Sequence, residues 1–348
     1  MTEPLYVLRL GRSRRLEKVL EAALSGIPAA ALSPELPALI PGSRLLFAAA
    51  VDEYGPSPEF FSFLRLLRQR ENCLRGCTAG IVVDGAGELY TKDAAQSLAL
   101  ALSMAGCGLP GSPLVEGTGS LFNQHIQAKN LGLSLEETYI SRIRELSRRV
   151  LAFTPPRFAH PDILMLHASD NLRSNTVWMG RETAKRLPPQ CSVTELSLQN
   201  GTIYDCRGCS YEACLHFAEN GRCFYGGTIA TDILPAIRRC NALLFLCPNY
   251  NDAVSANLMA LFNRLTNLLV RQDLSDKYLF GIVVSGYSGS DLVARQLLGA
   301  MSLNKTVMLP PRFCLLQTAH EPGTASRAEG IDGRLDAFAA GIARTLLA

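Results

Sequence analysis

The sequence predicts an α/β protein in which helices cover both faces of a parallel, doubly wound sheet. Two observations carry this prediction. Short apolar or β-branched runs alternate with longer segments of helical periodicity, as expected for βαβ units. The same order of runs then occurs twice, once in each half of the 348-residue chain. This length and repetition predict two domains.

The C-terminal half shows the alternation most clearly. Its first predicted strand covers residues 162–167, and a polar loop and a helix over 176–186 follow, ending before Pro188 and Pro189. Five strands with intervening helices in this order fit a flavodoxin-like sheet. The other strands are predicted over 193–198, 242–247 and 278–285 and in an apolar segment before the tail, with helices over 231–239, 255–270, 291–301 and 330–347.

Internal similarity indicates that the N-terminal half has the same fold. The segment LLFAAAVDEYG from Leu45 aligns with LLFLCPNYNDA from Leu243, and GIVVDG from Gly80 aligns with GIVVSG from Gly281. We interpret this as a tandem duplication, although strands followed by helices resemble one another in any α/β protein. We therefore predict tandem flavodoxin-like three-layer doubly wound domains with parallel five-stranded sheets. They cover residues 1–155 and 160–348, on either side of a proline-rich boundary.

Composition excludes several classes of function. Apolar residues make up 48% of the chain and charged residues 19%, and the formal net charge is +3, so nothing indicates binding to nucleic acid or to a membrane. No run reaches the roughly 18 to 20 apolar residues of a membrane span, and the N-terminus does not read as a secretory signal. We expect a cytoplasmic protein, in which the 11 cysteines are thiols, ligands or redox groups rather than disulfides.

Three loops of the C-terminal half form the candidate site, because ligands of a doubly wound sheet bind beyond the carboxyl ends of its strands. The first loop, residues 167–176, offers hydroxyl and amide side chains and free backbone N–H groups at a helix N-terminus. That combination suits a phosphate monoester, and an ordinary helix cap is the alternative. The loops over 247–255 and 285–291 place Tyr250 and Tyr287 where they could cover an aromatic ring, and simple turns are the alternative.

These loops resemble those of the NADPH-dependent FMN reductase family, and specifically its iron–sulfur-flavoprotein-like branch. The family's phosphate motif, G-S-x-R-x-x-S/G-N-T, is similar to residues 168–176, with Asn171 where the family has arginine. The motif P-x-Y-x-x-x-x-S-A-x-L-K-x-x-x-D-R is similar to residues 248–264, from which Met259 and Asn263 depart. The resemblance and the loops together suggest these FMN-binding residues: Ser169, Asn171, Arg173, Ser174, Asn175, Thr176, Pro248, Asn249, Tyr250, Asn251, Ser255, Ser285, Gly286, Tyr287 and Gly289.

The resemblance implies an FMN-dependent NAD(P)H oxidoreductase that passes electrons to a small-molecule or protein acceptor. It also implies a homo-oligomer, or an intramolecular pseudo-dimer in which the N-terminal domain takes a second subunit's part. The N-terminal copy keeps Ser13 but lacks the S-N-T cradle, and Asp52 and Glu53 would repel an anion, so we predict a degenerate domain without cofactor. The alternatives are an iron–sulfur flavoprotein that relays electrons between FMN and a cluster, and a non-catalytic FMN-binding module.

Four cysteines lie close together within an insertion over residues 199–227: Cys206, Cys209, Cys214 and Cys223. Thiolates at such spacing can hold an iron–sulfur cluster or Zn²⁺. Iron–sulfur flavoproteins carry a compact C-x2-C-x2-C-x4-7-C motif in this insertion for a [4Fe-4S] cluster, and the last two spacings of this chain are longer. A [4Fe-4S] cluster, zinc, and free or redox-active thiols are therefore three alternatives.

Overall fold

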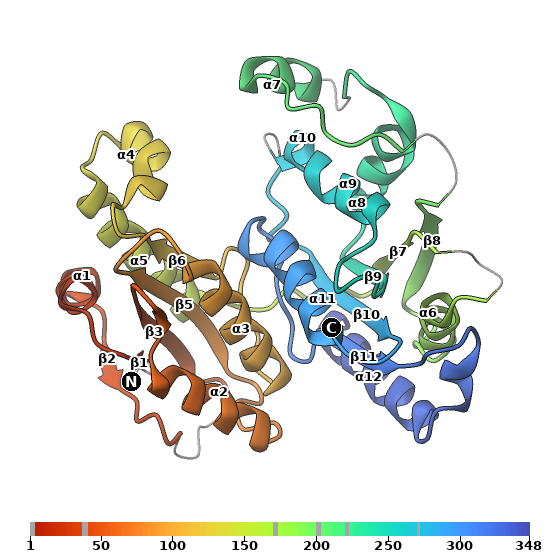
Figure 1. Cartoon of the computed structure of the whole chain (residues 1–348), viewed down its shortest axis with the longest axis horizontal. Helices are drawn as coiled ribbons and strands as arrows, with labels where there is room; N and C mark the ends of the chain where they lie inside the picture. The colour runs from red at the N-terminus through yellow and green to blue at the C-terminus, as the bar shows by residue number, and fades with distance from the viewer. Residues whose placement is uncertain (1–3, 37–40, 170–172, 200–202, 220–222, 270–271) are drawn as a thin grey trace. The chain divides into compact units, whose positions relative to one another are not determined.

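The chain folds as two compact units, Met1–Pro155 and Pro156–Ala348, each with its own parallel sheet (Figure 1). The computed structural model describes residues 4–36, 41–169, 173–199, 203–219, 223–269 and 272–348. In these residues no helix is both long enough and apolar enough to cross a bilayer.

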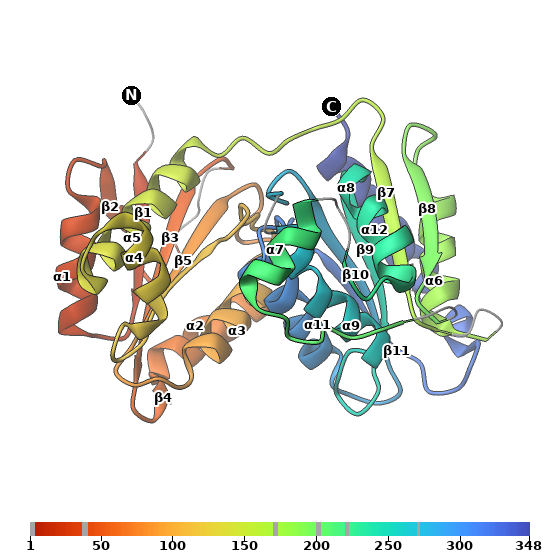
Figure 2. The same cartoon turned by 90° about the horizontal axis from the view of Figure 1, so that it is seen from above.

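The N-terminal unit is built on a sheet flanked by helices on both faces. Its strands are β1 (Leu5–Leu10), β2 (Ala29–Ala31), β3 (Arg44–Asp52), β4 (Gly55–Pro56), β5 (Thr78–Gly85) and β6 (Leu114–Gly117), and its helices are α1 (Arg14–Leu24), α2 (Pro58–Gln69), α3 (Thr91–Met104), η1 (Phe122–Gln124), α4 (His125–Leu131) and α5 (Leu135–Ala152). The parallel strands follow the order β2-β1-β3-β5-β6, and short β4 pairs antiparallel with β3. Helices α1 and α5 pack together, as do α2 and α3 (Figure 2).

The C-terminal unit has the same sheet topology. Its strands are β7 (Asp162–His167), β8 (Ser192–Ser197), β9 (Ala242–Pro248), β10 (Tyr278–Ser285) and β11 (Cys314–Thr318), and its helices are α6 (Asn175–Lys185), α7 (Tyr211–Glu219), η2 (Ile229–Ile233), α8 (Leu234–Arg239), α9 (Ala256–Arg264), α10 (Thr266–Leu269), α11 (Ser290–Leu298), η3 (Gly299–Leu303), η4 (Thr324–Arg327) and α12 (Ile331–Leu346). The strand order is β11-β10-β9-β7-β8, all parallel.

The predicted fold class is confirmed in both units. Counting only the parallel strands of each sheet along the chain, both read 2-1-3-4-5, which is the flavodoxin-like order. In this order the switch point lies between the first and third strands, here β7 and β9 of the C-terminal unit. The shared topology agrees with a tandem duplication, which itself stays a prediction.

Small residues set how closely the helices approach the C-terminal sheet. A Cβ on Gly180 of α6 would come within 2.7 Å of Leu246 on β9, and a Cβ on Gly281 of β10 would come within 2.8 Å of Leu297 on α11. Such distances leave no room for a side chain, so glycine permits the close packing. The N-terminus of α6 is thereby held against the switch point of the sheet.

Two predicted helices differ from the observed ones. The helix expected over 231–239 begins as a π-helical turn, η2, before α8 with Pro235 in its first turn. Proline has no N–H to donate to the preceding turn, which accounts for a change of hydrogen-bond pattern there. The helix expected over 255–270 is divided into α9 and α10.

Candidate functional site

The three candidate loops of the C-terminal unit follow β7, β9 and β10, which are adjacent in the sheet. Because the strands are parallel, their carboxyl ends share one edge, and the loops after β7 and β9 flank the switch point. The predicted phosphate and ring residues therefore lie on the ligand-binding edge of a single sheet.

The first loop brings three predicted hydroxyl groups together. Ser174 is the N-cap of α6 and accepts a hydrogen bond from the Val177 backbone N–H at 3.3 Å. Its Oγ lies 2.8 Å from Oγ1 of Thr176, which in turn lies 3.5 Å from Oγ of Ser169. Ser169 and Thr176 are buried. Hydroxyl groups next to the N-terminus of an 11-residue helix can donate to an anion there.

This loop contains three other predicted residues, of which the structure describes Arg173 and Asn175. Arg173 is exposed, and Asn171 lies outside the described residues. Asn175 uses its amide within the protein: Nδ2 donates to the Glu321 carbonyl at 2.9 Å, and Oδ1 accepts from the Ala325 N–H at 3.1 Å. Asn175 therefore ties α6 to the chain after β11, a role that its place in the motif did not indicate.

The second loop is held by Asn249, which follows the last residue of β9, Pro248. Asn249 Nδ2 lies within hydrogen-bond distance of three acceptors: Asp252 Oδ1 at 3.1 Å, Ser285 Oγ at 3.1 Å and the Ser288 carbonyl at 3.0 Å. These contacts join the second loop to the third. The adjoining residues of the loop are the left-handed Asn251, at φ 53°, and the exposed Tyr250.

The third loop packs directly against the second. Ser285 ends β10 fully buried and accepts a hydrogen bond from Ser290 Oγ at 2.8 Å. Gly289 has φ +83°, and a Cβ there would collide with the Asp252 carboxylate. Gly286 and the exposed Tyr287 lie between them. The Tyr287 hydroxyl is 3.0 Å from Nε2 of His320, and the two rings are 4.5 Å apart.

His320 lies beside the candidate site, and the sequence did not single it out because it follows β11, not β7, β9 or β10. A Cβ on Gly286 would lie 3.3 Å from its Nδ1, so it belongs to the same edge. No motif marks it. Only the adjacency of β10 and β11 in the sheet brings His320 to Tyr287.

The second loop contains two buried polar atoms that suit a bound aromatic cofactor. Asn249 Oδ1 and Ser255 Oγ are buried and have no hydrogen-bond partner among the described residues. Such atoms in native proteins are usually satisfied by a ligand or by water. An acceptor and a hydroxyl beside glycine-containing backbone fit the hydrogen-bonding edge of FMN, so the residues present fit this cofactor.

Contacts among His167, Glu195 and Arg181 link the two elements that flank the first loop, β7 and α6. His167, the last residue of β7, is fully buried, and its Nε2 lies 3.2 Å from Glu195 on β8. Glu195 also accepts two hydrogen bonds from Arg181 on α6, at 2.7 and 3.0 Å. The hydrogen bond with Arg181 is the main cause of the lowered pKa of Glu195, whereas burial lowers the pKa of His167. The strand end and the helix that carry the first loop are thereby linked.

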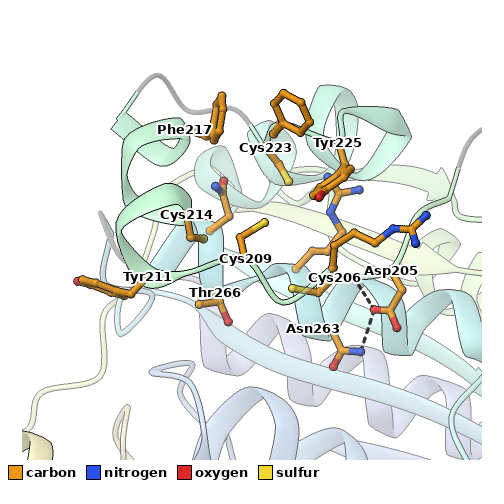
Figure 3. Close-up of a pocket in the computed structure, with 14 residues that line it drawn as sticks. Asp205, Cys206, Cys209, Tyr211, Cys214, Phe217, Cys223, Tyr225, Asn263 and Thr266 are labelled. Carbon is orange, nitrogen blue, oxygen red and sulfur yellow. Dashed lines mark hydrogen bonds between the residues drawn. The ribbon is translucent and has the colours of Figure 1, made fainter.

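The four clustered cysteines line one pocket of about 260 Å³. Figure 3 shows their side chains around it, with Cys206 and Cys209 on the segment before α7, Cys214 on α7, and Cys223 beyond it. Burial raises the pKa of the Cys214 thiol, and the other three cysteines raise it further. The remaining lining residues are Asp205, Arg207, Tyr211, Phe217, Phe224, Tyr225, Asn263, Arg264, Thr266 and Asn267.

The cysteines are not arranged for a single metal ion. Among the residues that the structure describes, no group of three or more His, Cys, Asp or Glu side chains could hold one. A tetrahedral ion needs all its sulfur ligands about 2.3 Å from one point. The zinc and [4Fe-4S] alternatives therefore have no support from the arrangement of the four described cysteines, which share one pocket as free thiols.

The corresponding edge of the N-terminal unit is filled by its own side chains. Arg15 donates to Asp84 Oδ1 at 2.8 Å and to the carbonyls of Gly119 and Gly85 at 2.8 and 2.7 Å. Ser13 donates to Asp84 Oδ2 at 2.7 Å. Asp84 is buried at the position that aligns with Ser285.

The structure does not place Asp52 and Glu53, which were predicted to repel an anion, in a buried position. Both residues are exposed, and Asp52 accepts a hydrogen bond from the Tyr54 N–H at 2.7 Å within a turn. The buried charge at this edge is instead Asp84, which is paired with Arg15.

The comparisons with known proteins concern the C-terminal unit. Residues 161–321 match the family described as NADPH-dependent FMN reductase. The resemblance predicted from the loop motifs is thus confirmed for this part of the chain, which has the sequence pattern of a flavin oxidoreductase. No curated protein matches the chain. The assignment to the iron–sulfur branch stays a prediction.

Solved structures give weaker likenesses. RosB with a bound riboflavin-phosphate intermediate has a TM-score of 0.43 and 14% identity over 53% of this chain and 78% of its own. A NAD(P)H:quinone oxidoreductase from Methanothermobacter marburgensis has a TM-score of 0.42 and 14% identity over 53% and 98%. An FMN-dependent NADH-azoreductase from Bacillus anthracis has a TM-score of 0.36 and 10% identity over 52% and 99%. These likenesses add no argument to the family match.

Proposed function

We propose that the protein is an FMN-dependent NAD(P)H oxidoreductase whose cofactor binds at the carboxyl edge of the C-terminal sheet. The observation that carries the proposal is that three loops, two of them flanking the switch point, share the carboxyl edge of a sheet whose unit matches the FMN reductase family. Two buried, unpartnered oxygen atoms, on Asn249 and Ser255, support it.

The hydroxyl groups of the first loop would hold the phosphate. Thr176 Oγ1 lies 2.8 Å from Ser174 Oγ and 3.5 Å from Ser169 Oγ. The N-terminus of α6 adds its backbone N–H groups. Asn175 contributes by fixing α6, and Arg173 would supply the positive charge that the family has two positions earlier. Asn171 keeps its predicted role without structural support, because it lies outside the described residues.

The second and third loops would place the ring. Asn249 holds them together, which fixes the backbone from Pro248 to Asn251 and that of Gly286 and Gly289. Tyr250 and Tyr287 are 57% and 76% exposed, so both are available to contact a ring or a second substrate. When bound, FMN supplies the redox chemistry, accepting hydride from NAD(P)H and passing the electrons on. The protein orients the ring and limits its contact with water.

The N-terminal unit would carry no cofactor. Its equivalent edge is occupied by the ion pair of Arg15 and Asp84. Two predictions remain: that the N-terminal unit takes the part of a second subunit, and that the whole chain forms a homo-oligomer. Turnover of residues 161–348 alone would test the first, and light scattering of the full chain would test the second. The electron acceptor is proposed only as a class, a small molecule or a protein.

Titration of FMN fluorescence with the full chain tests this proposal. We expect saturable quenching at one FMN per chain. A chain that does not quench FMN, or that binds two equivalents, would contradict it.

A second candidate function involves the cysteine pocket. Helix α9 begins directly after the second loop, which ends at Ser255, and the last residue of this helix, Arg264, lines the pocket. Nine residues of α-helix span only about 12 Å, so the proposed ring site and the pocket lie at opposite ends of one short helix. A [4Fe-4S] cluster there would make the protein an electron relay between FMN and a partner. Iron and sulfide analysis of anaerobically purified protein tests this, and protein that holds neither under any loading would exclude the relay.

A further inference from the structure

His167 is a fully buried histidine at the point where β7 passes into the first loop. Its side chain shares a face of the sheet with that of Met165, because alternate residues of a strand point the same way. Met165 packs against α6, since a Cβ on Gly180 of that helix would come within 2.9 Å of its Sδ. His167 therefore lies on the side of the sheet that α6 covers, close to the end of the helix that bounds the proposed phosphate site.

One ring nitrogen of His167 is paired and the other is not. Nε2 lies 3.2 Å from Oε1 of Glu195 on β8. Nδ1 is buried and has no hydrogen-bond partner among the residues that the structure describes. Such an atom is rare in native proteins and is usually satisfied by a ligand or by water. When Nε2–H donates to the carboxylate, Nδ1 carries the lone pair that can take up a second proton.

The His167 ring lies close to the residues that are proposed to hold the FMN phosphate. Ser169 follows two residues later, so the Cα atoms of the two residues are at most about 7 Å apart. Burial lowers the pKa of His167, and the main chain of Ser169 acts against this shift, which shows that the ring is near the loop. Both side chains are buried, so a negative charge beside Ser169 would act on the ring through little solvent.

The charges around His167 leave the ring neutral in the chain without cofactor. Burial is the main cause of its lowered pKa, while Glu195 on β8 acts to raise that pKa and Arg181 on α6 acts to lower it. Arg181 also holds the Glu195 carboxylate through two hydrogen bonds, so part of its negative charge is already balanced. In β9, on the other side of β7, the residue that pairs with His167 is the apolar Leu246.

We propose that His167 takes up a proton when the phosphate of FMN binds, and that the resulting imidazolium offsets the charge of this anion at the N-terminus of α6. The proposal rests on the function proposed above, to which it adds a positioning residue that no motif marks. The proton comes from solvent and goes to Nδ1, while Nε2–H stays with Glu195. A compensating charge is worth more in a buried site than in water, which gives the protonation its driving force.

Protonation and FMN affinity are then linked. If binding takes up a proton, affinity rises as the pH falls, over the range between the pKa of His167 in the free chain and its higher pKa in the loaded chain. The direction is diagnostic. The phosphate has its own second pKa of about 6, and its protonation makes it a weaker anion, which lowers affinity as the pH falls.

Calorimetric titration of the full chain with FMN at about pH 7, in two buffers of different ionisation enthalpy, counts the protons that are taken up. His167→Gln removes the proton acceptor. Glu195→Gln keeps the ring but removes the carboxylate that favours the imidazolium. His160→Gln, an exposed position outside the site, is the matched control. Riboflavin is titrated against each protein because it lacks the phosphate.

We expect the unmodified chain and His160→Gln to take up about half a proton or more for each FMN bound, with affinity falling about threefold or more from about pH 7 to about pH 8. His167→Gln should take up none, and Glu195→Gln should take up less than the unmodified chain. Riboflavin should bind to every protein without proton uptake.

Two results would overturn the proposal and leave the FMN site standing: FMN binding by the unmodified chain without proton uptake, or equal uptake by the unmodified chain and His167→Gln. If His167→Gln does not fold, Glu195→Gln takes its place, and uptake equal to that of the unmodified chain would contradict the proposal. A chain that binds no FMN would remove the proposed function as well, so the two failures are distinguishable.

Discussion

Arg15 and Asp84 form an ion pair of 2.8 Å at the carboxyl edge of the N-terminal sheet, although 69 residues separate them in the chain. The Asp84 side chain is 2% exposed, and that of Arg15 is 26% exposed. In the C-terminal unit the aligned residue, Ser285, belongs to the proposed FMN site. The same edge of the same fold therefore carries an internal ion pair in one unit and a proposed cofactor site in the other.

Replacing Asp84 by Asn should destabilise the N-terminal unit. The substitution leaves Arg15 without its partner, and because Arg15 is 26% exposed and can reach water, we expect a loss of about 2 kcal/mol, below the typical cost for a fully buried pair. Urea unfolding of the full chain, with hydrogen exchange of β5 to identify the transition, measures the effect. The control is Glu145→Gln, which removes a 71% exposed carboxylate from a surface pair and should change little. Equal effects of the two substitutions would contradict the structural role of Asp84.

Substitutions in the first loop should weaken the binding of FMN but not that of riboflavin, which lacks the phosphate. Ser174→Ala removes a hydroxyl from the cluster and the N-cap of α6, so we expect FMN affinity to fall about tenfold. Thr176→Ala should do the same. Fluorescence titration with both flavins checks this. Ser192→Ala, at the amino end of β8, is the control, and equal losses for FMN and riboflavin would refute the phosphate assignment.

Asn249→Ala should weaken the binding of both flavins. The substitution removes the contacts that join the second and third loops, so the ring site should loosen whether or not a phosphate is present. We expect a loss of about tenfold for each flavin. The exposed Asn304 provides a matched Asn→Ala control. Selective loss of FMN alone would place Asn249 at the phosphate instead.

Acid should destabilise the C-terminal unit through His167. Burial lowers its pKa, so between that value and the unfolded value of about 6.5 the unfolded chain binds more protons. Stability therefore falls as the pH drops below about 6.5 and levels off below the folded pKa. Urea unfolding at several pH values should give a shallower dependence for His167→Gln. Part of the dependence should remain, because the lowered pKa of Glu195 acts in the same direction. An unchanged slope would contradict this account.

The sequence predicted the sheet and the loops because strand periodicity and turn residues are local signals. Ser174 and Thr176 were found in this way, since a hydroxyl before a helix marks its N-terminus whatever the rest of the chain does. The parallel order then placed the three loops at one edge. These steps need no knowledge of side-chain contacts.

Residues whose roles depend on distant contacts were not found from the sequence. His320 meets Tyr287 only because β10 and β11 are neighbours. Asn175 was assigned to the phosphate by its place in the motif, yet its amide is bonded to Glu321 and Ala325. For the N-terminal unit, the sequence drew attention to the exposed Asp52, while the buried charge is Asp84.

The most direct test of the account is one anaerobic absorption spectrum of the purified full chain, recorded before and after NADPH is added. The account predicts flavin bands equivalent to one FMN per chain that NADPH bleaches. A broad additional absorption would indicate a cluster as well. A chain loaded with FMN whose flavin bands persist after NADPH, or a chain that takes up no flavin at all, would contradict the central claim.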